Sequence, residues 1–478
     1  MAARRHARAA CRPVGVPAGP QTTVRQPWRR VKRTIDNKNK SQAMNNKPHP
    51  PMGRLLLSAG IVLGLPAAAG AAESGFFKDA TATLQARNYY FSRDYSDIVG
   101  PSKQSKTEEW AQGFILNFKS GYTPGPVGFG IEAIGLLGIK LDSSPDRAGS
   151  GLLPGAYGKT AADDYSRLGL TGKVKLSKTE LKAGELQPNV PVLTYTDNRL
   201  LPNTYQGVSI SSAEITGLTL QAGHLSSIKL RSEAGTEDIG AIVGYAPKRD
   251  SRKQLITGDS FSYAGGDYAF NQNRTTASAW YGQLEDLYHQ HFVGLKHSLP
   301  VGSWTFGANL GYFDSREDGK HLIGKIDNQA FYSLLSAKYG AHTVYAGYQG
   351  MYGTTGFPRL FVAVSPLGNE VPTYEFASAD ERSWQLRYDY DFTGLGLPGL
   401  SSTVRYISGD NVDAQSANGG GPRYEGKDWE RDLDLAYVVQ SGPLKNFSVR
   451  VRNVTARSNY RTDIDENRLI LSYTLSLF

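Results

Sequence analysis

The sequence predicts an all-β protein, a transmembrane antiparallel up-and-down β-barrel of about 18 strands, and three observations carry this prediction. Many segments alternate apolar and polar residues, as "RLILSYTLSLF" does at the C-terminus, and a period of two is typical of strands. Short turns and long polar loops follow each other in regular order along the chain. Charged residues occupy one face of several strands, where a water-filled lumen solvates them and a dry core does not.

The composition fits a β-rich chain and excludes two other classes. The 478 residues include 53 Gly and 27 Tyr, which favour many turns and strands, and the mean hydropathy of −0.40 excludes a bundle of membrane helices. The net charge of +9 comes from residues 1–72, which hold 13 of the 53 Lys and Arg but only one of the 44 acids. The remaining chain carries 40 basic and 43 acidic residues, so we expect no nucleic-acid partner.

The N-terminal region predicts export from the cytoplasm. Residues 44–72 have the pattern of a secretory signal peptide, because a charge at Arg54 precedes a short apolar run and then small residues, with cleavage after Ala71 or Ala72. A membrane anchor is disfavoured, since the apolar run is too short to span a bilayer. Residues 1–43 are expected to be disordered or to precede the true start, and the alternative start residues are Met1, Met44 and Met52.

Residues 73–478 are predicted to form the barrel, and eight short turns divide them into strands. One further strand at each end gives an even number, so both chain ends lie on the side of the short turns. A soluble sandwich gives no reason for short connections at one end and long ones at the other, whereas an outer-membrane barrel has short periplasmic turns and long extracellular loops. The short turns lie at 123–128, 177–179, 216–217, 271–273, 300–302, 340–341, 393–399 and 441–446.

The two faces of each strand differ in polarity. In "RSWQLRYDYDF", Trp384, Leu386 and Tyr388 share one face, while Arg387 and Asp389 share the other. The apolar face is predicted to meet lipid and the polar face to line the lumen.

The C-terminal strand must pair with the first strand, near residues 80–91, because a barrel leaves no strand edge in lipid. Its last residue breaks the alternation, since Phe478 follows Leu477 directly. This predicts either that the chain leaves the strand at the rim or that a bulge turns Phe478 back to the lipid face.

A group of basic residues falls on the polar faces. A guanidinium keeps its charge and presents a planar fork that fits a carboxylate, so the group predicts selection of anions. The alternative for each single residue is a solvated position on the wall, or a pair with a lumen acid such as Glu132, Asp389 or Asp434. By strand phase the group comprises Arg87, Lys119, Lys140, Arg167, Lys173, Lys175, Arg387, Arg405, Arg450, Arg452 and Arg468.

A selective barrel also needs a narrow part, which is usually an inward-folded loop. The segment 187–207 is the best candidate, because prolines stiffen it and it carries apolar residues that an outside loop does not need. We expect this third loop to fold into the lumen, with Asp197 and Arg199 flanking the passage.

Several phrases of the chain resemble the OprD family of Gram-negative outer-membrane porins. They are "ARNYYFSRD", "TDNRLLPNTYQG", "ASAWYGQLEDLY", "GANLGYFD" and "VRYISGDN", which occur in this order and span most of the chain from residue 80. The resemblance implies a monomeric barrel, an inward third loop and a basic ladder that guides small carboxylate-bearing solutes, basic amino acids in some members and aromatic acids in others. It assigns ladder positions to Arg387, Arg405, Arg450 and Arg452, to which strand phase adds Arg87, and it places Arg199 in the constricting loop.

The expected function is passive, selective diffusion of small anionic or zwitterionic solutes across the outer membrane, with outer-membrane lipid and the barrel assembly machinery as partners and no cofactor. Two alternatives stay open, an enzyme built on a barrel and a surface receptor with a plugged lumen. The sequence has no G-x-S-x-G turn to support a hydrolase. His289, His291 and His297 share a strand face without an acid or cysteine at ligand spacing, so no metal site is expected.

Overall fold

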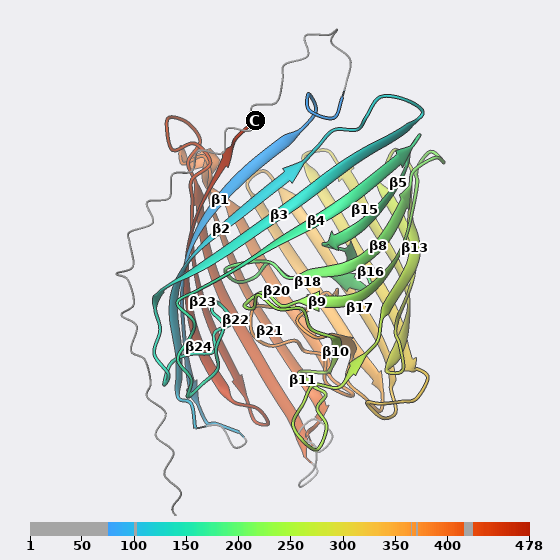
Figure 1. The fold of residues 1–478 in the computed structure, drawn as a ribbon. Helices are drawn as coiled ribbons and strands as arrows, with labels where there is room; N and C mark the ends of the chain where they lie inside the picture. The colour runs from blue at the N-terminus through green and yellow to red at the C-terminus, as the bar shows by residue number, and fades with distance from the viewer. Residues whose placement is uncertain (1–74, 100–102, 365, 370, 415–423) are drawn as a thin grey trace, which may run out of the picture. The chain divides into compact units, whose positions relative to one another are not determined.

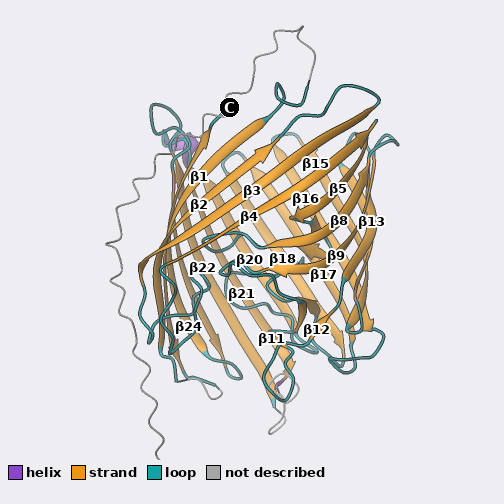
Figure 2. Cartoon of the chain, viewed as in Figure 1, coloured by secondary structure: helices purple, strands orange, loops and turns teal. Residues whose placement is uncertain are grey.

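The computed structural model describes residues 75–99, 103–364, 366–369, 371–414 and 424–478, which belong to one compact unit. They form a closed antiparallel barrel of 18 strands, as the sequence predicted (Figure 1, Figure 2). The predicted leader and signal peptide, residues 1–43 and 44–72, lie outside the described residues. Among the described residues, none of the helical segments is long and apolar enough to span a membrane.

The bounds of the barrel strands and of the short elements in the connections are as follows. The barrel consists of β1 (Thr81–Ser96), β2 (Lys106–Lys119), β3 (Val127–Asp142), β4 (Asp164–Leu176), β5 (Thr179–Leu186), β8 (Thr204–Ser212), β9 (Leu218–Lys229), β13 (Phe261–Phe270), β14 (Thr275–Leu284), β15 (Tyr288–Val301), β16 (Trp304–Glu317), β17 (Asp327–Tyr339), β18 (His342–Gly353), β20 (Arg382–Asp391), β21 (Leu400–Asp413), β22 (Glu425–Val438), β23 (Ser448–Ser458) and β24 (Asp463–Ser476). The connections contain β6 (Asn189–Val190), β7 (Leu193–Thr194), β10 (Ile239–Val243), β11 (Ala246–Pro247), β12 (Thr257–Gly258), β19 (Pro358–Leu360) and the 3₁₀ turn η1 (Phe392–Leu395).

The first and last strands close the barrel. β1 pairs with β24 from Thr83 opposite Ser476 to Ser96 opposite Asp463, so neither strand has an unpaired edge. Below this register Ala82 bonds to two successive residues, because its carbonyl accepts from the Leu477 N–H and its N–H donates to the Phe478 carbonyl. One extra residue opposite Ala82 is the mark of a β-bulge. The bulge leaves Phe478 64% exposed, with its ring centroid 6.3 Å from that of Phe118.

Most connections differ in length at the two ends of the barrel, as predicted, but residues 285–287 and 459–462 are short connections at the end where long loops were expected. All eight expected short turns join neighbouring strands at one end, as residues 177–178 join β4 to β5 and residues 340–341 join β17 to β18. Gly340 has φ +56°, a left-handed conformation that glycine adopts without steric cost in a tight hairpin. The longer connections, such as residues 143–163, 230–260 and 354–381, lie at the other end (Figure 2).

Alternate residues of each strand point to opposite sides of the wall. On β20 the outward Leu386 is 55% exposed, whereas its neighbour Gln385 is 2% exposed because it faces a lumen that loops fill. On β22 the outward Leu433 and Leu435 are likewise exposed, whereas Asp432, which precedes Leu433, is buried. The predicted assignment of apolar faces to the outside therefore holds on both strands.

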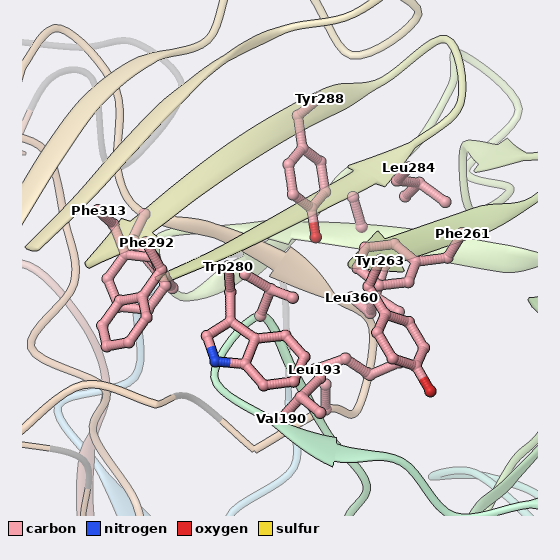
Figure 3. Close-up of a cluster of buried hydrophobic side chains, with 14 of the residues drawn as sticks. Val190, Leu193, Phe261, Tyr263, Trp280, Leu284, Tyr288, Phe292, Phe313 and Leu360 are labelled. Atoms are coloured by element: carbon pink, nitrogen blue, oxygen red, sulfur yellow. The ribbon is translucent and has the colours of Figure 1, made fainter. Parts of the chain in front are cut away.

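The main apolar core lies inside the barrel and is built by loops. Residues 187–203, residues 230–260 and the described part of 354–381 pack against the inward faces of β13 to β17. There Val190, Leu193 and Leu360 join wall residues that include Trp280 and Phe313 (Figure 3). Backbone bonds connect these loops, since β10 pairs with β19 and the Val364 N–H donates to the Thr194 carbonyl at 3.1 Å. The sequence prediction named only the first of the three segments.

The outward face of β22 provides a test of the membrane orientation. Replacing the lipid-facing Leu435 with arginine, Leu435→Arg, should lower the free energy of unfolding by about 2–4 kcal/mol, the cost of such a charge near the bilayer midplane. Urea unfolding of the barrel in lipid vesicles measures this change. Ala436→Arg is the matched control, because residue 436 faces the lumen, and equal effects of the two substitutions would contradict the assigned faces.

Candidate functional site

A row of arginines runs across the inner face of neighbouring strands. The strand register places Arg387 of β20 opposite Arg405 of β21, and Arg405 opposite Asp432 of β22. It also places Arg452 of β23 between Asp434 of β22 and Arg468 of β24. The alternation of each strand turns all these side chains inward, so the row follows from register and phase alone.

Each of the predicted ladder arginines on β20 to β23 has an acidic partner. Arg387 Nε donates to Asp389 Oδ1 at 2.8 Å, and Arg405 Nε donates to Asp432 Oδ2 at 2.8 Å. Arg452 Nε donates to Asp434 Oδ2 at 2.7 Å, while Arg450 Nε lies 3.2 Å from Asp434 Oδ1. One carboxylate therefore serves two guanidinium groups, and one positive charge is in excess there. A cavity of about 160 Å³ lies among these four arginines.

Strand β22 supplies most of these counter-charges. Its inward positions carry Asp428, Glu430, Asp432 and Asp434 in strict alternation. Glu430 binds a loop and not an arginine. Its carboxylate accepts hydrogen bonds from the backbone N–H groups of residues 373 and 374, at 3.1 and 2.6 Å. Asp428 pairs with Arg461 near the loop end. The strand thus joins the arginine row to the loop that covers it.

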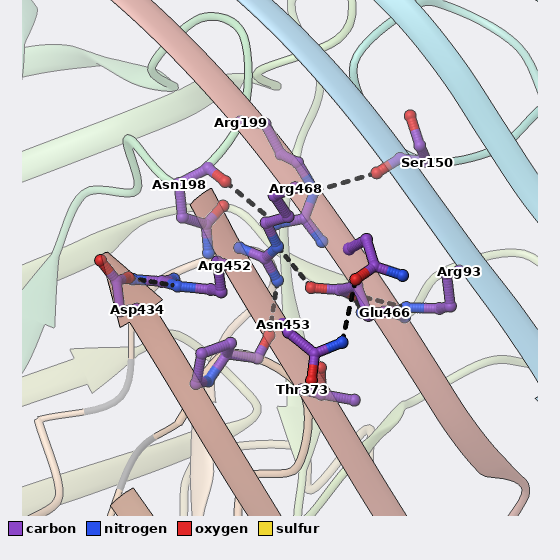
Figure 4. A network of polar contacts seen from close by, with 12 residues as sticks. Arg93, Ser150, Asn198, Arg199, Thr373, Asp434, Arg452, Asn453, Glu466 and Arg468 are labelled. Atoms are coloured by element: carbon purple, nitrogen blue, oxygen red, sulfur yellow. Dashed lines mark hydrogen bonds and ion pairs between the residues drawn. The ribbon is translucent and has the colours of Figure 1, made fainter. Parts of the chain in front are cut away.

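A second group of arginines surrounds one buried carboxylate. Arg93 of β1 donates from Nε to Glu466 Oε2 at 2.7 Å, and Arg468 of β24 pairs with the other oxygen of Glu466 (Figure 4). Arg199 and Arg231 come from loops and bond only to neutral oxygens, the Ser150 carbonyl at 3.0 Å and the Asn198 side chain at 2.8 Å. We call Arg93, Arg199, Arg231, Arg468 and Glu466 the Glu466 cluster, which holds four guanidinium groups and one carboxylate.

The positive charges of the Glu466 cluster repel one another. Burial, followed by the repulsion of Arg468 and Arg231, lowers the pKa of Arg199 well below its ordinary value. Burial and Arg468 also lower the pKa of Arg231, to about 10. Arginine nevertheless stays protonated at neutral pH, so the cluster carries uncompensated charge. A negative group that approaches the Glu466 cluster offsets the repulsion among its guanidinium groups, so binding of an anion there is favourable.

The segment 187–203 is fastened to the wall beside this cluster. Arg87 of β1 donates to both oxygens of Asp197, at 2.6 and 3.0 Å, and to the Arg199 carbonyl at 2.9 Å. Leu200 lies directly over Gly113 of β2, where a Cβ atom would come within 3.0 Å of Leu200 Cγ. A larger residue at position 113 would push the segment from the wall.

The two residues predicted to flank the passage, Asp197 and Arg199, lie in different surroundings. The Asp197 side chain is 39% exposed, whereas Arg199 is 7% exposed and its guanidinium lies 4.9 Å from the Phe91 ring centroid, against the wall. Sequence reasoning missed Arg93 and Glu466, although strand phase puts both on inward faces. It also missed Arg231, which only the packing of a loop brings to the site.

Two cavities of about 460 Å³ each lie beside other parts of the wall. In the first, Glu132 binds Lys182 at 2.9 Å and Lys173 at 3.5 Å, and Lys119 also lines the space. The second is lined by apolar residues such as Phe292 and Tyr332, by the charged Asp267 and Lys296, and by several amides and hydroxyls. Charged and apolar side chains therefore face the same lumen.

The described residues contain no group of three or more His, Cys, Asp or Glu side chains placed to hold a metal ion. His289 and His291 lie with their ring centroids 5.9 Å apart and alternate with the buried Tyr288 and Gln290, so they lie on the outward face of β15. They are not part of the lumen site.

Comparison with known proteins finds relatives along nearly the whole barrel. Residues 74–477 match the family model of outer membrane porins of the OprD family. The porin-like protein GalP of Pseudomonas putida is 43% identical over 406 residues, which cover 84% of this chain and 93% of that protein. The crystal structure of OccK9 (OpdG) of Pseudomonas aeruginosa is 48% identical, with a TM-score of 0.78 over 84% of this chain and 100% of the other. OpdK of the same organism, crystallised with vanillate, is 45% identical with a TM-score of 0.77 over the same shares.

The contacts of Arg87 predict a change in conductance. Arg87→Met removes the donor to Asp197 and to the backbone of the segment 187–203, so we expect the segment to loosen and single-channel conductance in planar bilayers to rise. Arg450→Met is the control, because Arg450 pairs with Asp434 and not with this segment. Wild-type conductance and noise in Arg87→Met would mean that the apolar contacts of Leu200 hold the segment without Arg87.

Proposed function

The chain belongs to the OprD family of outer-membrane porins, and we propose that it passes small carboxylate-bearing solutes, amino acids or aromatic acids, passively down their concentration gradient. The family consists of channels that reside in the outer membrane, and its members are not enzymes. The solute class is our inference, and it rests on the charges of the lumen wall.

The Glu466 cluster is the observation that carries the proposal. Its four guanidinium groups and single carboxylate leave an excess of positive charge that a solute carboxylate would offset. A charge-assisted hydrogen bond in such a site contributes about 1.5–3 kcal/mol, which favours entry without preventing release. A neutral sugar gains none of this electrostatic term.

The arginine row offers the next positions along the wall. Arg468 of the cluster is the register partner of Arg452, and neighbouring strands lie about 5 Å apart. A carboxylate drawn toward the cluster therefore meets Arg452 and Arg450, which share Asp434 and are more exposed than Arg468. We infer that solutes move in steps of this size, each step replacing one guanidinium partner with the next.

The apolar side chains in one of the larger cavities would accept the hydrocarbon part of the solute. The cavity that includes Val190, Phe292 and Tyr332 has a volume of about 460 Å³, enough for an aromatic ring or an aliphatic side chain. OpdK was crystallised with vanillate, an aromatic carboxylate, and its 45% identity to this chain supports the same chemical class here.

Three further parts of the proposal concern assembly. One chain builds the whole described wall and its inner loops, so we propose that a monomer forms the channel. The exposed terminal Phe478 is a suitable contact for the barrel assembly machinery. Residues 44–72 are proposed as the signal peptide that directs export.

The role of the row can be tested at Arg450, whose side chain is half exposed to the lumen. Arg450→Gln removes the excess charge at Asp434, so we expect uptake of benzoate into liposomes to fall several-fold while uptake of a neutral sugar stays unchanged. Liposome swelling measures both rates, and the reversal potential in a salt gradient should shift toward lower anion preference.

The control is Lys296→Gln, which removes one positive charge from another part of the lumen. An equal loss of benzoate uptake in both variants would mean that general lumen charge is sufficient. An equal loss of benzoate and sugar uptake in Arg450→Gln would indicate simple damage to the pore and would contradict the proposed guiding role.

A further inference from the structure

The outward face of the barrel carries a belt of aromatic residues near its loop end, and the two strands β23 and β24 interrupt this belt. On one side Trp384, Tyr406 and Trp429 of β20 to β22 form a continuous row, with ring centroids 5.6 and 5.8 Å apart. On the other side Tyr90 of β1 contacts Trp110 of β2, with centroids 6.5 Å apart. Such belts lie at the boundary between hydrocarbon and headgroups.

Polar side chains fill the gap between the two aromatic rows. Arg431 of β22 is the register partner of Tyr406, and Asn453 of β23 is the register partner of Asn467 of β24. All three point outward, because they share strand faces with the lipid-facing Leu433, Val451 and Leu469. At the level of the lipid headgroups, this part of the barrel therefore presents one arginine and two amide side chains where the neighbouring strands present aromatic rings.

Hydrogen bonds hold these side chains in one arrangement. Arg431 Nη2 donates to Asn453 Oδ1 and to Thr455 Oγ1, both at 2.9 Å. Asn453 Nδ2 donates to Asn467 Oδ1 at 2.9 Å. The guanidinium is thereby fixed by neutral partners, while its remaining donors stay available on an exposed surface.

No carboxylate of the described residues lies within 4 Å of the Arg431 guanidinium. Arg316 of β16 is a useful contrast, because it also lies on the outward face but pairs with Asp314 at 3.0 Å and with Asp327. A positive charge that faces lipid without a partner is costly unless it lies at the interface and meets an anion. Arg431 lies at the aromatic belt and therefore at the interface, so we expect an anion from outside the protein to be its partner.

We propose that Arg431, Asn453 and Asn467, which we call the Arg431 site, bind a phosphate group of lipopolysaccharide, the phosphorylated glycolipid of the outer leaflet. The planar guanidinium fork fits phosphate oxygens, and the amides can bond to the sugar that carries the phosphate. The flanking rings of Trp429 and Tyr90 would pack against the sugar and the upper acyl chains. This proposal does not depend on the solute that the channel passes.

The test uses the folded full-length barrel, freed of lipid in detergent, with lipopolysaccharide and a dephosphorylated form of it as probes. Native mass spectrometry and thermal unfolding measure binding and stabilisation. We expect Arg431→Gln to weaken binding of lipopolysaccharide by about tenfold or more, since a charge-assisted bond contributes at least about 1.4 kcal/mol. Wild-type protein should bind the dephosphorylated form no better than the variant binds lipopolysaccharide.

Arg316→Gln is the matched control, since it removes an outward arginine that already has acidic partners, and its binding should stay at the wild-type level. Arg431→Lys keeps the charge and should retain part of the binding even if Arg431→Gln folds poorly. Equal binding by Arg431→Gln and wild type, or equal binding of both lipid forms, would overturn the proposal. A wild-type dimer that dissociates in the Arg431→Gln variant would also overturn the proposal, because the site would then be an interface between two copies of the chain.

Discussion

The pairing of β1 with β24 is the constraint on which the other features depend. Hydrocarbon offers no partner for backbone N–H and C=O groups, so a sheet survives there only when it closes on itself. Closure fixes the register of every strand and therefore which side chains face inward. The same closure extends through the bulge at Ala82, which keeps the last two residues paired and still places Phe478 on the outside.

Inside this wall, apolar and charged surfaces are separated. Three loops bring their apolar residues to the inner faces of β13 to β17, and arginines with their acids line β20 to β24 and β1. Neither surface could occupy the other's place, because buried carboxylates need donors and apolar loop residues need a dry partner. The separation buries the apolar residues between loops and wall on one side of the barrel and places the arginines with their acids on the other side.

The fold could be predicted from sequence because its signals are local. Alternation in "RSWQLRYDYDF" and eight short turns specify strands and their order, and phase alone places Arg387, Arg405 and Arg452 on inward faces. The site was less accessible to such reasoning. Arg231 reaches the Glu466 cluster only through the packing of residues 230–260, and Arg199 lies against Phe91 instead of the open lumen because of contacts with Ser150. Contacts between distant loops leave no periodic trace in the sequence.

The acids of β22 change how the arginine row would treat a passing anion. Each guanidinium of the row already contacts an internal carboxylate, which Arg450 and Arg452 share, so a solute carboxylate competes with Asp432 or Asp434 for the same donors. Under the proposed function, the wall would act as an ion-exchange resin does, with one carboxylate replacing another of similar affinity. Exchange between near-equal partners costs little in either direction, so retention on the wall would be brief even where the local positive charge is high.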